Sequence, residues 1–597
     1  MLRRNPSALI GIAILIIVTS ATVLSADSPK RIPALKASPA TSAEQETDRA
    51  VADLKASIPV LMNKARIPGL QIALIREGRI IWEGAYGVTS SSGQKAVTTD
   101  TIFEAASLSK PLFAYAVMKM VDEKLIDLDT PLLGAFPPEQ VERYLGHPLD
   151  AEGFRLDWAK KITARHVLSH SAGMPHGDRG EIYTIFFEPG TDWKYSAGGY
   201  QFLQLVVEKL KGQPLEEIID AYVLEPLGMQ HSSMVWREAY EKTMANGHFL
   251  YSDPVDFRKR SEATAAASLY TTAGDYARFA IAVLNGTGLK PETAKEMFTS
   301  FIEMNDDGNL GWGLGFGTQV DGERTAFWQW GDYGIFRNYV IADPNQRSGV
   351  VYLTNSFNGL SVCSEVVTKS IGQEALGCLD LGYLQYDSPA YALMWDLKEK
   401  GPQAATAQLP ALIKKFPGVF TQERVNGLGE IMENENMYEE AAAIYRCNAT
   451  QHPNSGSALY SLARASVLTG HLVEAKKQYK ASLSAPENPA EQAAVDWAMD
   501  HIKALEDPAT FEEDELQRIA GDYGPRHLIV TDGSLHYFRE DGDTSKPRPL
   551  MAVSKDTFFI EGVSYFKLQV VFDEEGKPSK LVGIYESGQR DESPRDP

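Results

Sequence analysis

The sequence predicts a multidomain protein with three parts: an α/β domain whose antiparallel sheet is flanked by helices, an α-helical repeat segment, and a small antiparallel β domain. Three observations support this division. Strand patterns open and close the region 46–385, helical periodicity with a regular repeat fills 388–507, and alternating apolar residues between glycine turns fill 511–590. At 597 residues the chain is also too long for a single hydrophobic core.

The N-terminus carries an export signal. Two arginines precede an apolar run over 8–24, which ends in the small residues Ser-Ala. We expect residues 1–26 to be a secretory signal peptide, so that the mature chain is periplasmic or secreted. The alternative is an uncleaved membrane anchor, because the apolar run is long. Residues 27–45, rich in Ser, Ala and Pro, are expected to be a linker.

The region 46–385 mixes strands and helices. It begins with the hairpin pattern QIALIREGRIIWEGAYGV, continues with helical segments, and returns to strands from GWGLGFGTQV to VVYLTN. Strands from both ends are expected to join in one antiparallel sheet, with the middle helices around it.

The alanine-rich segment 388–507 repeats itself. Three pairs of residues each lie 34 positions apart: Leu428 and Leu462, Ala441 and Ala475, Tyr445 and Tyr479. Small and aromatic residues at this period resemble tetratricopeptide repeats. Two units need flanking helices to close their core, and they are expected to form either a groove for a protein partner or a spacer or dimerisation element.

The segment 511–590 alternates apolar residues between Asp-Gly, Glu-Gly and Gly-Lys turns, which is typical of successive β-hairpins. The last residues, DESPRDP, are expected to be a frayed tail.

Composition excludes several function classes. A net charge of −21 argues against nucleic acid and anionic membranes as partners. Three cysteines are too few for a disulfide-stapled fold, and Cys363 and Cys378 are expected either to pair or to remain buried thiols. His166 and His170 lie four residues apart without an evident third ligand, so we expect helix-end and core histidines and no metal.

The candidate chemistry begins with Ser107 and Lys110 in the run SLSKPLFAYAVMKMV. Ser-x-x-Lys at the start of an amphipathic helix places a hydroxyl and an amine on one face, one turn apart. A serine hydroxyl needs a base to become nucleophilic, and a desolvated lysine can be that base. Without further motifs, a helix cap and a surface lysine explain the pair equally well.

Two later segments supply those motifs. Tyr195 stands in a Tyr-Ser-Ala element just before a helix, and Gly331 stands in a Gln-Trp-Gly strand. Ser-x-x-Lys, Tyr-x-Asn and Lys/His-x-Gly is the motif order of serine penicillin-recognising enzymes. The chain resembles their class C β-lactamase-like serine hydrolases, which include esterases, D-amino-acid peptidases and transacylases. Connecting segments such as ITARHVLSHSAGMP and SLYTTAGDYARF agree in order, over residues 46–380.

The resemblance implies the roles of the site residues. Ser107 would be the nucleophile, Lys110 its proton partner, and Tyr195, beside an ammonium, a base or relay with a depressed pKa. The oxyanion hole would be the N–H groups of Ser107 and Asp332, with Gly331 letting the strand approach the substrate. The family often carries a small C-terminal β-barrel-like domain, which 511–590 resembles.

Three departures from the family pattern concern substrate handling. Ala197 replaces the asparagine of Tyr-x-Asn, Gln329 replaces the Lys or His of the third motif, and Ile335 replaces the glycine of a Gly-Phe pair. A neutral amide at 329 recognises a carboxylate weakly, which favours neutral esters or amides over β-lactams. Trp330 beside it is expected either to line an acyl pocket or to be a core aromatic.

Asp275, in TTAGDYARF, is expected to be a helix cap rather than a catalytic acid.

These residues predict an exported serine hydrolase that acts through an acyl-enzyme on a small ester, amide or peptide, without metal or organic cofactor. One alternative is a penicillin-binding, β-lactamase-type or D-Ala peptidase activity. Another is a catalytically attenuated cell-envelope binding protein that works through its helical repeats.

Overall fold

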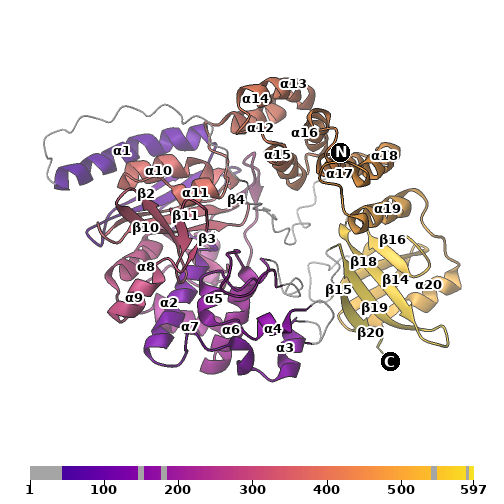
Figure 1. Ribbon diagram of the computed structural model, residues 1–597, viewed down its shortest axis with the longest axis horizontal. Helices are drawn as coiled ribbons and strands as arrows, with labels where there is room; N and C mark the ends of the chain where they lie inside the picture. Colours follow the sequence, from indigo (N-terminus) through magenta and orange to yellow (C-terminus); the bar gives the residue numbers. More distant parts are fainter. Residues whose placement is uncertain are drawn as a thin grey trace. The chain divides into compact units, whose positions relative to one another are not determined.

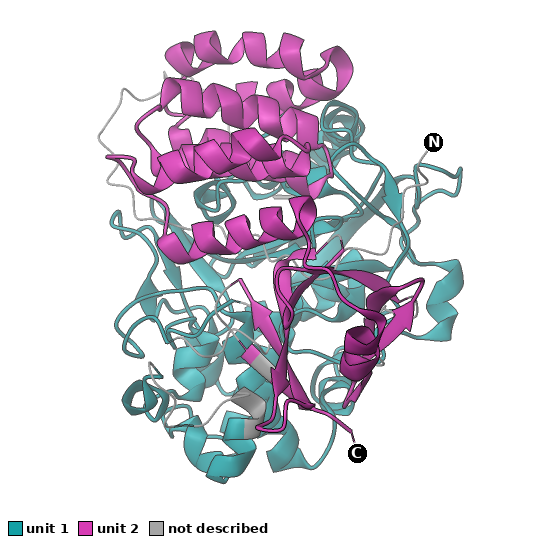
Figure 2. Ribbon diagram, turned by 90° about the vertical axis from the view of Figure 1, so that its right-hand side faces the viewer, with its two compact units in different colours: residues 1–386 teal, residues 387–597 magenta. Residues whose placement is uncertain are grey.

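The computed structural model describes residues 43–145, 149, 154–176, 185–539, 547–561, 563–586 and 590–596. Two compact units divide the chain, residues 1–386 and 387–597 (Figure 2). The predicted signal peptide lies outside the described residues, as does the predicted linker up to the start of α1 (Ala43–Lys64). Among the helices that are described, none is long and apolar enough to cross a membrane.

An eight-stranded antiparallel sheet, in the order β2-β1-β12-β11-β10-β9-β8-β7, forms the centre of the first unit (Figure 1). Its strands are β1 (Gly69–Arg76), β2 (Arg79–Gly87), β7 (Ile302–Glu303), β8 (Leu310–Trp312), β9 (Gly317–Asp321), β10 (Arg324–Asp332), β11 (Arg337–Asp343) and β12 (Ser348–Thr354). The first hairpin pairs with the last strand, with Leu70 opposite Thr354. The predicted sheet, built from both ends of the region, is therefore confirmed.

Each face of this sheet has its own apolar core. Along β1, Ala73 and Ile75 belong to one core and Ile72 and Leu74 to the other, as the two-residue period of a strand dictates. α8 (Ala273–Asn285) covers the first face, and α1 and α10 (Cys363–Ile371) cover the second (Figure 1). The other described α-helices of this unit are α2 (Ser109–Asp122), α3 (Pro138–Leu145), α4 (Leu156–Ala159), α5 (Ala164–Leu168), α6 (Ala197–Lys211), α7 (Leu215–Ile219), α9 (Pro291–Met297) and α11 (Leu376–Asp380).

Two short antiparallel pairs complete the first unit. β3 (Phe103–Ala106) pairs with β6 (Leu269–Thr271), and β4 (Gly247–His248) pairs with β5 (Pro254–Val255). β3 also contacts β10, β11 and β12 of the main sheet, which fixes the segment that enters α2.

The second unit begins with helices. They are α12 (Pro389–Lys400), α13 (Pro402–Ala407), α14 (Leu409–Lys415), α15 (Gln422–Asn434), α16 (Tyr438–Gln451), α17 (Gly456–Leu468), α18 (Leu472–Leu483), α19 (Gln492–Glu506) and α20 (Glu513–Ile519). α15 and α17 begin 34 residues apart, and so do α16 and α18. The helical segment is confirmed, while its assignment to the tetratricopeptide family stays a prediction.

The chain ends in an eight-stranded antiparallel sheet whose strands follow one another in sequence order. They are β13 (Gly521–Tyr523), β14 (Arg526–Thr531), β15 (Ser534–Arg539), β16 (Arg548–Ala552), β17 (Thr557–Ile560), β18 (Val563–Phe572), β19 (Pro578–Tyr585) and β20 (Arg590–Pro594). The predicted β domain is confirmed, but the frayed tail is wrong. Residues 590–594 pair with β19 because the exposed edge of that strand offers free backbone groups.

Candidate active site

Ser107 lies at the turn between β3 and α2, and it is the one partly exposed residue in the otherwise buried run 101–110. The preceding residue, Ala106, has a φ of 51°, a left-handed conformation that is unusual for a residue with a Cβ. The hydroxyl of Ser109 donates to the Ala106 carbonyl at 2.7 Å and holds this turn. The backbone N–H of Ser107 makes no hydrogen bond to a described carbonyl, so it is available to an oxyanion.

Lys110 is buried beside the serine. Its Nζ lies 3.1 Å from the Ser107 Oγ and donates to the Ala266 carbonyl at 2.8 Å. The ammonium position is 4.8 Å from the centre of the Tyr195 ring, and no carboxylate of the described residues forms an ion pair with it. Burial therefore lowers the pKa of Lys110 to about 7, and a large share of the amine is neutral at neutral pH.

Tyr195 is held in place by His170. The His170 carbonyl accepts from the Lys194 N–H at 2.9 Å, and its Nδ1 accepts from the Ser196 N–H at 3.0 Å. The Tyr195 ring lies 4.3 Å from the His170 ring and 4.5 Å from the Trp330 ring, centre to centre. Its phenol hydrogen-bonds the Ser107 hydroxyl, so the predicted trio of serine, lysine and tyrosine comes together.

The predicted depression of the Tyr195 pKa is wrong. Burial raises the pKa of this phenol well above its usual range, and the hydrogen bonds with Ser107 and Gln329 offset only part of that effect. The prediction assumed an ammonium beside the ring, whereas Lys110 is itself desolvated and Gln329 carries no charge. The Tyr195 phenol, with its raised pKa, therefore stays protonated at neutral pH.

Gln329 is the residue of the third motif that reaches the serine. It is fully buried on β10, and its Nε2 donates to the Tyr195 hydroxyl oxygen at 2.9 Å and to the Ser107 carbonyl at 3.3 Å. Gly331, two residues on, leaves no room for a side chain, because a Cβ there would lie 2.1 Å from the Ala105 carbonyl oxygen. Both contacts place this strand beside the segment 105–107.

Trp330 and Asp332 have their side chains engaged. Trp330 is 8% exposed and packs on Tyr195. The Asp332 carboxylate accepts from the Tyr383 hydroxyl at 2.7 Å and lies 3.1 Å from the Arg337 Nε. The roles of Gly331 and the Asp332 N–H as substrate contacts stay predictions.

Sequence reasoning missed several residues of this site. Ala266 supplies the acceptor for Lys110, and Arg337 and Tyr383 hold Asp332. His176 lies 5.4 Å from the Tyr195 ring, and burial with nearby lysines lowers its pKa to about 4. Of these residues, only His176 could have been predicted from the sequence, because it directly follows the family-like segment ITARHVLSHSAGMP.

The two histidines of that segment have structural roles. His166 is the third residue of a capping box at the start of α5, with Thr163 as the N-cap. His170 holds the backbone on both sides of Tyr195. Cys363 and Cys378 are both buried and unpaired, which is one of the two expected outcomes.

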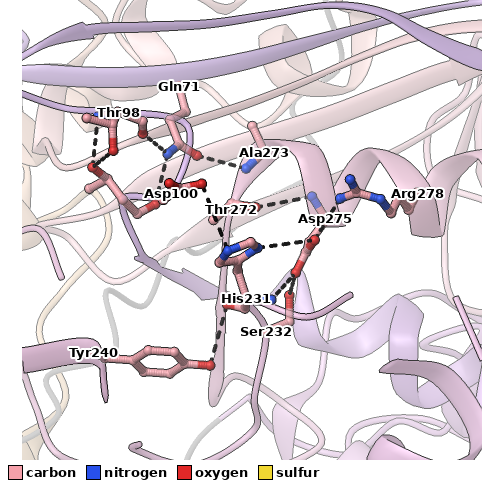
Figure 3. A network of polar contacts seen from close by, with 11 residues as sticks. Gln71, Thr98, Asp100, His231, Ser232, Tyr240, Thr272, Ala273, Asp275 and Arg278 are labelled. Atoms are coloured by element: carbon pink, nitrogen blue, oxygen red, sulfur yellow. Dashed lines mark hydrogen bonds and ion pairs between the residues drawn. The ribbon is translucent and has the colours of Figure 1, made fainter. Parts of the chain in front are cut away.

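A second polar cluster surrounds the start of α8 (Figure 3). Thr272, not Asp275, is the N-cap, since its hydroxyl accepts from the Asp275 N–H; the predicted cap is therefore displaced by three residues. The buried Asp275 carboxylate accepts from the His231 N–H at 2.7 Å and the Ser232 hydroxyl at 2.9 Å. These bonds connect the segment 231–232 to the start of α8.

Comparisons with known proteins identify the family of the chain. Residues 48–364 match the family described as Beta-lactamase. Esterase EstB of Burkholderia gladioli is 24% identical over 367 residues, which span 52% of this chain and 92% of the esterase. A putative D-alanyl-D-alanine carboxypeptidase of Escherichia coli O157:H7 is 22% identical over 353 residues, 49% of this chain and 79% of that protein. The crystal structure of D-alanine carboxypeptidase AmpC from Burkholderia cenocepacia aligns with a TM-score of 0.46 and 21% identity, covering 55% of this chain and 99% of that one.

Proposed function

Because this chain belongs to the Beta-lactamase family of serine hydrolases, we propose that it is an exported enzyme that cleaves a small ester, amide or peptide through an acyl-enzyme on Ser107. The observation that carries this proposal is the Lys110 amine, buried, with a pKa of about 7 and its Nζ 3.1 Å from the Ser107 Oγ. A neutral amine at that distance can take the hydroxyl proton at neutral pH. The relatives named as an esterase and a carboxypeptidase support this substrate range.

The hydrogen bonds of the cluster connect the three groups. Gln329 can only donate through Nε2, so the Tyr195 oxygen accepts from it, and this oxygen also accepts from the Ser107 hydroxyl. Lys110 donates to the Ser107 Oγ and to the Ala266 carbonyl, and its neutral form has a lone pair that can take the Ser107 proton. Nucleophile, base and proton donor are therefore arranged before substrate arrives.

In acylation, Lys110 takes the Ser107 proton as Oγ forms a bond to the substrate carbonyl carbon. The carbonyl oxygen becomes an oxyanion that accepts from the N–H groups of Ser107 and Asp332. When the intermediate collapses, the bond to the leaving group breaks and Tyr195 gives that group its proton. Lys110 then returns a proton to the Tyr195 oxygen.

In deacylation, water attacks the ester of Ser107 and loses its proton to the neutral Lys110 amine. The second tetrahedral intermediate releases the acid, and Ser107 recovers its proton from Lys110. The proton transfers between Ser107 and Lys110 use groups that already contact each other in the cluster.

The neutral Gln329 favours the esterase over the penicillin-recognising alternative. A substrate carboxylate near this strand would meet an amide and not a cation, which weakens its recognition. The attenuated binding protein is the less favoured alternative, since the lysine, the tyrosine and the turn at Ala106 are all arranged around the serine.

The test is the intact mass of the purified chain after treatment with a fluorophosphonate and, separately, with a penicillin. We expect a single fluorophosphonate adduct on the wild type and none on Ser107→Ala. A Ser107-dependent adduct with the penicillin as well would promote the penicillin-recognising alternative. No adduct with either reagent would remove the proposed mechanism.

Ser232→Ala is the matched control. This serine is fully buried and directly follows a histidine in sequence, but its hydroxyl donates to Asp275. We expect its fluorophosphonate adduct to form as in the wild type. If a folded Ser232→Ala protein lost fluorophosphonate labelling, the nucleophile would be Ser232 and not Ser107.

A further inference from the structure

The carboxylate of Asp332 is held by three groups. Its Oδ1 accepts from the Gly334 N–H at 2.6 Å, while its Oδ2 accepts from the Tyr383 hydroxyl at 2.7 Å and lies 3.1 Å from the Arg337 Nε. The side chains of this ion pair are largely buried, with 18% of Asp332 and 9% of Arg337 exposed. The carboxylate therefore has one favoured position, because turning it would break a charge-assisted contact.

The backbone N–H of Asp332 points away from β11. The Tyr333 N–H donates to the Phe336 carbonyl at 3.0 Å, so these residues form a hydrogen-bonded pair at the end of the β10–β11 hairpin. Such pairs alternate with non-hydrogen-bonded pairs along antiparallel strands, and the next pair is Asp332 with Arg337. On the other side of β10, the described pairing with β9 ends at Trp328. The Asp332 N–H is thus available to a substrate oxygen.

The strand that carries this N–H lies against the turn of the nucleophile. A Cβ on Gly331 would lie 2.1 Å from the Ala105 carbonyl oxygen, and the Gln329 Nε2 lies 3.3 Å from the Ser107 carbonyl oxygen. Asp332 is therefore one residue beyond the closest printed approach of β10 to the segment 105–107.

Tyr383 comes from outside the part of the chain that matches the family. The match ends at residue 364, and Tyr383 lies between the end of α11 at Asp380 and the start of the second unit at 387. Burial, and after it the nearby Asp332 carboxylate, raises the pKa of the Tyr383 phenol well above its usual range. The phenol therefore keeps its proton and remains a donor to Asp332.

We propose that Tyr383 and Arg337 are positioning residues, which hold the Asp332 carboxylate so that the Asp332 N–H stays directed at the substrate oxyanion. This proposal rests on the hydrolase function proposed above. The carboxylate and the N–H belong to one residue, so a fixed side chain restricts the backbone dihedral angles there. Direction matters because a hydrogen bond weakens steeply when it bends, and an oxyanion hole works through donors that are already oriented.

Tyr383→Phe tests the proposal in the full-length protein by removing one hydroxyl. We expect kcat for p-nitrophenyl acetate to fall about 10-fold and KM to stay within about 2-fold, because the oxyanion forms only after substrate has bound. The acidic limb of kcat/KM should stay where the wild type has it, since Lys110 is unchanged. The hairpin keeps a separate anchor, as the Tyr333 hydroxyl donates to the Ala267 carbonyl at 2.6 Å.

Tyr352→Phe is the matched control. Its hydroxyl is also a donor to a backbone carbonyl, that of Gly359 at 3.3 Å, and its strand β12 belongs to the same sheet. We expect kcat of this variant to stay within about 2-fold of the wild type. An equal loss of kcat in the control and in Tyr383→Phe would assign both losses to general stability and overturn the positioning role.

A double-mutant cycle asks whether Tyr383 acts through Asp332. Asp332→Ala should lower kcat by about 100-fold, near the effect of losing one oxyanion donor, and adding Tyr383→Phe should then cost less than about 2-fold. Arg337→Gln should lower kcat about 10-fold; its guanidinium also donates to the Phe357 carbonyl, so this variant is read only where circular dichroism shows a folded chain. An equal cost of Tyr383→Phe with and without the Asp332 carboxylate would overturn the proposal.

Butylboronic acid gives a readout at the oxyanion position itself. Its boron bonds reversibly to the Ser107 Oγ, and a boron-bound oxygen then occupies the place of the oxyanion. Its inhibition constant should rise in Tyr383→Phe by about the factor by which kcat falls. Ser107-dependent turnover with wild-type kcat in Tyr383→Phe would retain the hydrolase and reject the positioning role. A wild type without Ser107-dependent turnover would overturn the hydrolase function and this proposal together.

Discussion

Two clusters in the first unit both centre on a serine. The cluster around α8 joins Ser232, His231 and Asp275, the residue types of a familiar catalytic triad (Figure 3). The reactive cluster instead joins Ser107 with Lys110 and Tyr195. Residue type alone would favour the first cluster as a catalytic site, yet the function proposed above places the nucleophile in the second.

The direction of the hydrogen bonds explains the difference. The Ser232 hydroxyl is fully buried and donates straight to the Asp275 carboxylate at 2.9 Å, while the His231 Nδ1 lies 4.0 Å from the other carboxylate oxygen. A carboxylate is a weak base, so Ser232 keeps its proton. Ser107 instead faces an amine whose pKa burial lowers to about 7, and it is partly exposed to substrate. A serine whose hydroxyl is hydrogen-bonded to a carboxylate stabilises the fold, whereas a serine beside a desolvated amine can lose its proton to that amine.

The largest effect is expected for Lys110→Ala. Removing the base should lower kcat/KM for a p-nitrophenyl ester on the order of 1000-fold, since proton transfer then falls to water. Lys119→Ala is the control on the same helix: its Nζ donates to the Tyr222 carbonyl, far along α2 from the serine. A small loss in the Lys110 variant, similar to that of the control, would assign the base to another group.

Asp275→Ala should affect stability and not catalysis. The substitution removes the acceptor of the His231 backbone N–H, one hydrogen-bond partner of Ser232 and the ion-pair partner of Arg278, with an expected loss of about 3 kcal/mol in the free energy of unfolding. The folded fraction should retain the wild-type kcat, measured after active-site titration with the fluorophosphonate. A stable but inactive Asp275→Ala protein would contradict the distinction between the two clusters.

Sequence periodicity and motif order were sufficient for the fold and for the three side chains that meet at Ser107, while their catalytic roles stay predictions. The hairpin at 69–87 and the strands before Thr354 showed that both ends of the region build one sheet, because strand patterns are local. The direction of the Tyr195 pKa shift could not be predicted from the sequence, because it depends on how deeply the ring is buried among His170 and Trp330. The Ala266 carbonyl, which accepts from Lys110, is a backbone group that every residue type has, so the sequence could not indicate it.

The pH dependence of kcat/KM should follow Lys110. Only the neutral amine accepts the serine proton, so kcat/KM rises with pH up to a pKa of about 7 and falls about 10-fold per pH unit below it. A profile from pH 5 to 9 with a neutral ester measures this limb. If the Lys110→Ala variant kept the same acidic limb of kcat/KM, the titrating group would not be Lys110.

The same pKa shift makes a prediction about stability. The pKa of Lys110 lies below its unfolded value, so between pH 7 and about 10 the unfolded chain binds more protons than the folded one. Burying Lys110 therefore costs most near pH 7, and the cost shrinks as pH rises. Lys110→Met should exceed the wild type in stability by more at pH 7 than at pH 9.5, as measured by urea unfolding.

The smallest effects are expected for two fully buried glutamines. Gln71 lies in the cluster around α8, and Gln329 lies in the cluster around Ser107. Gln71 on β1 has both ends of its amide paired, donating to the Thr101 carbonyl at 2.8 Å and accepting from the Ala273 N–H at 2.9 Å (Figure 3). Gln329 donates to Tyr195, but its Oε1 has no hydrogen-bond partner among the described residues. Gln71→Leu should therefore lower the free energy of unfolding by about 2 kcal/mol and leave kcat unchanged.

Gln329→Leu should show the opposite behaviour. Loss of one neutral hydrogen bond to Tyr195 lets the phenol rotate away from Ser107, with an expected fall in kcat of about 5-fold and almost no loss of stability. Gln329→Glu sharpens the result, because a carboxylate accepts and cannot donate to the Tyr195 oxygen, so it should draw the phenol proton away from Ser107. Equal kcat in wild type, Leu and Glu variants would mean that Gln329 fills space beside the reactive cluster and does not orient it.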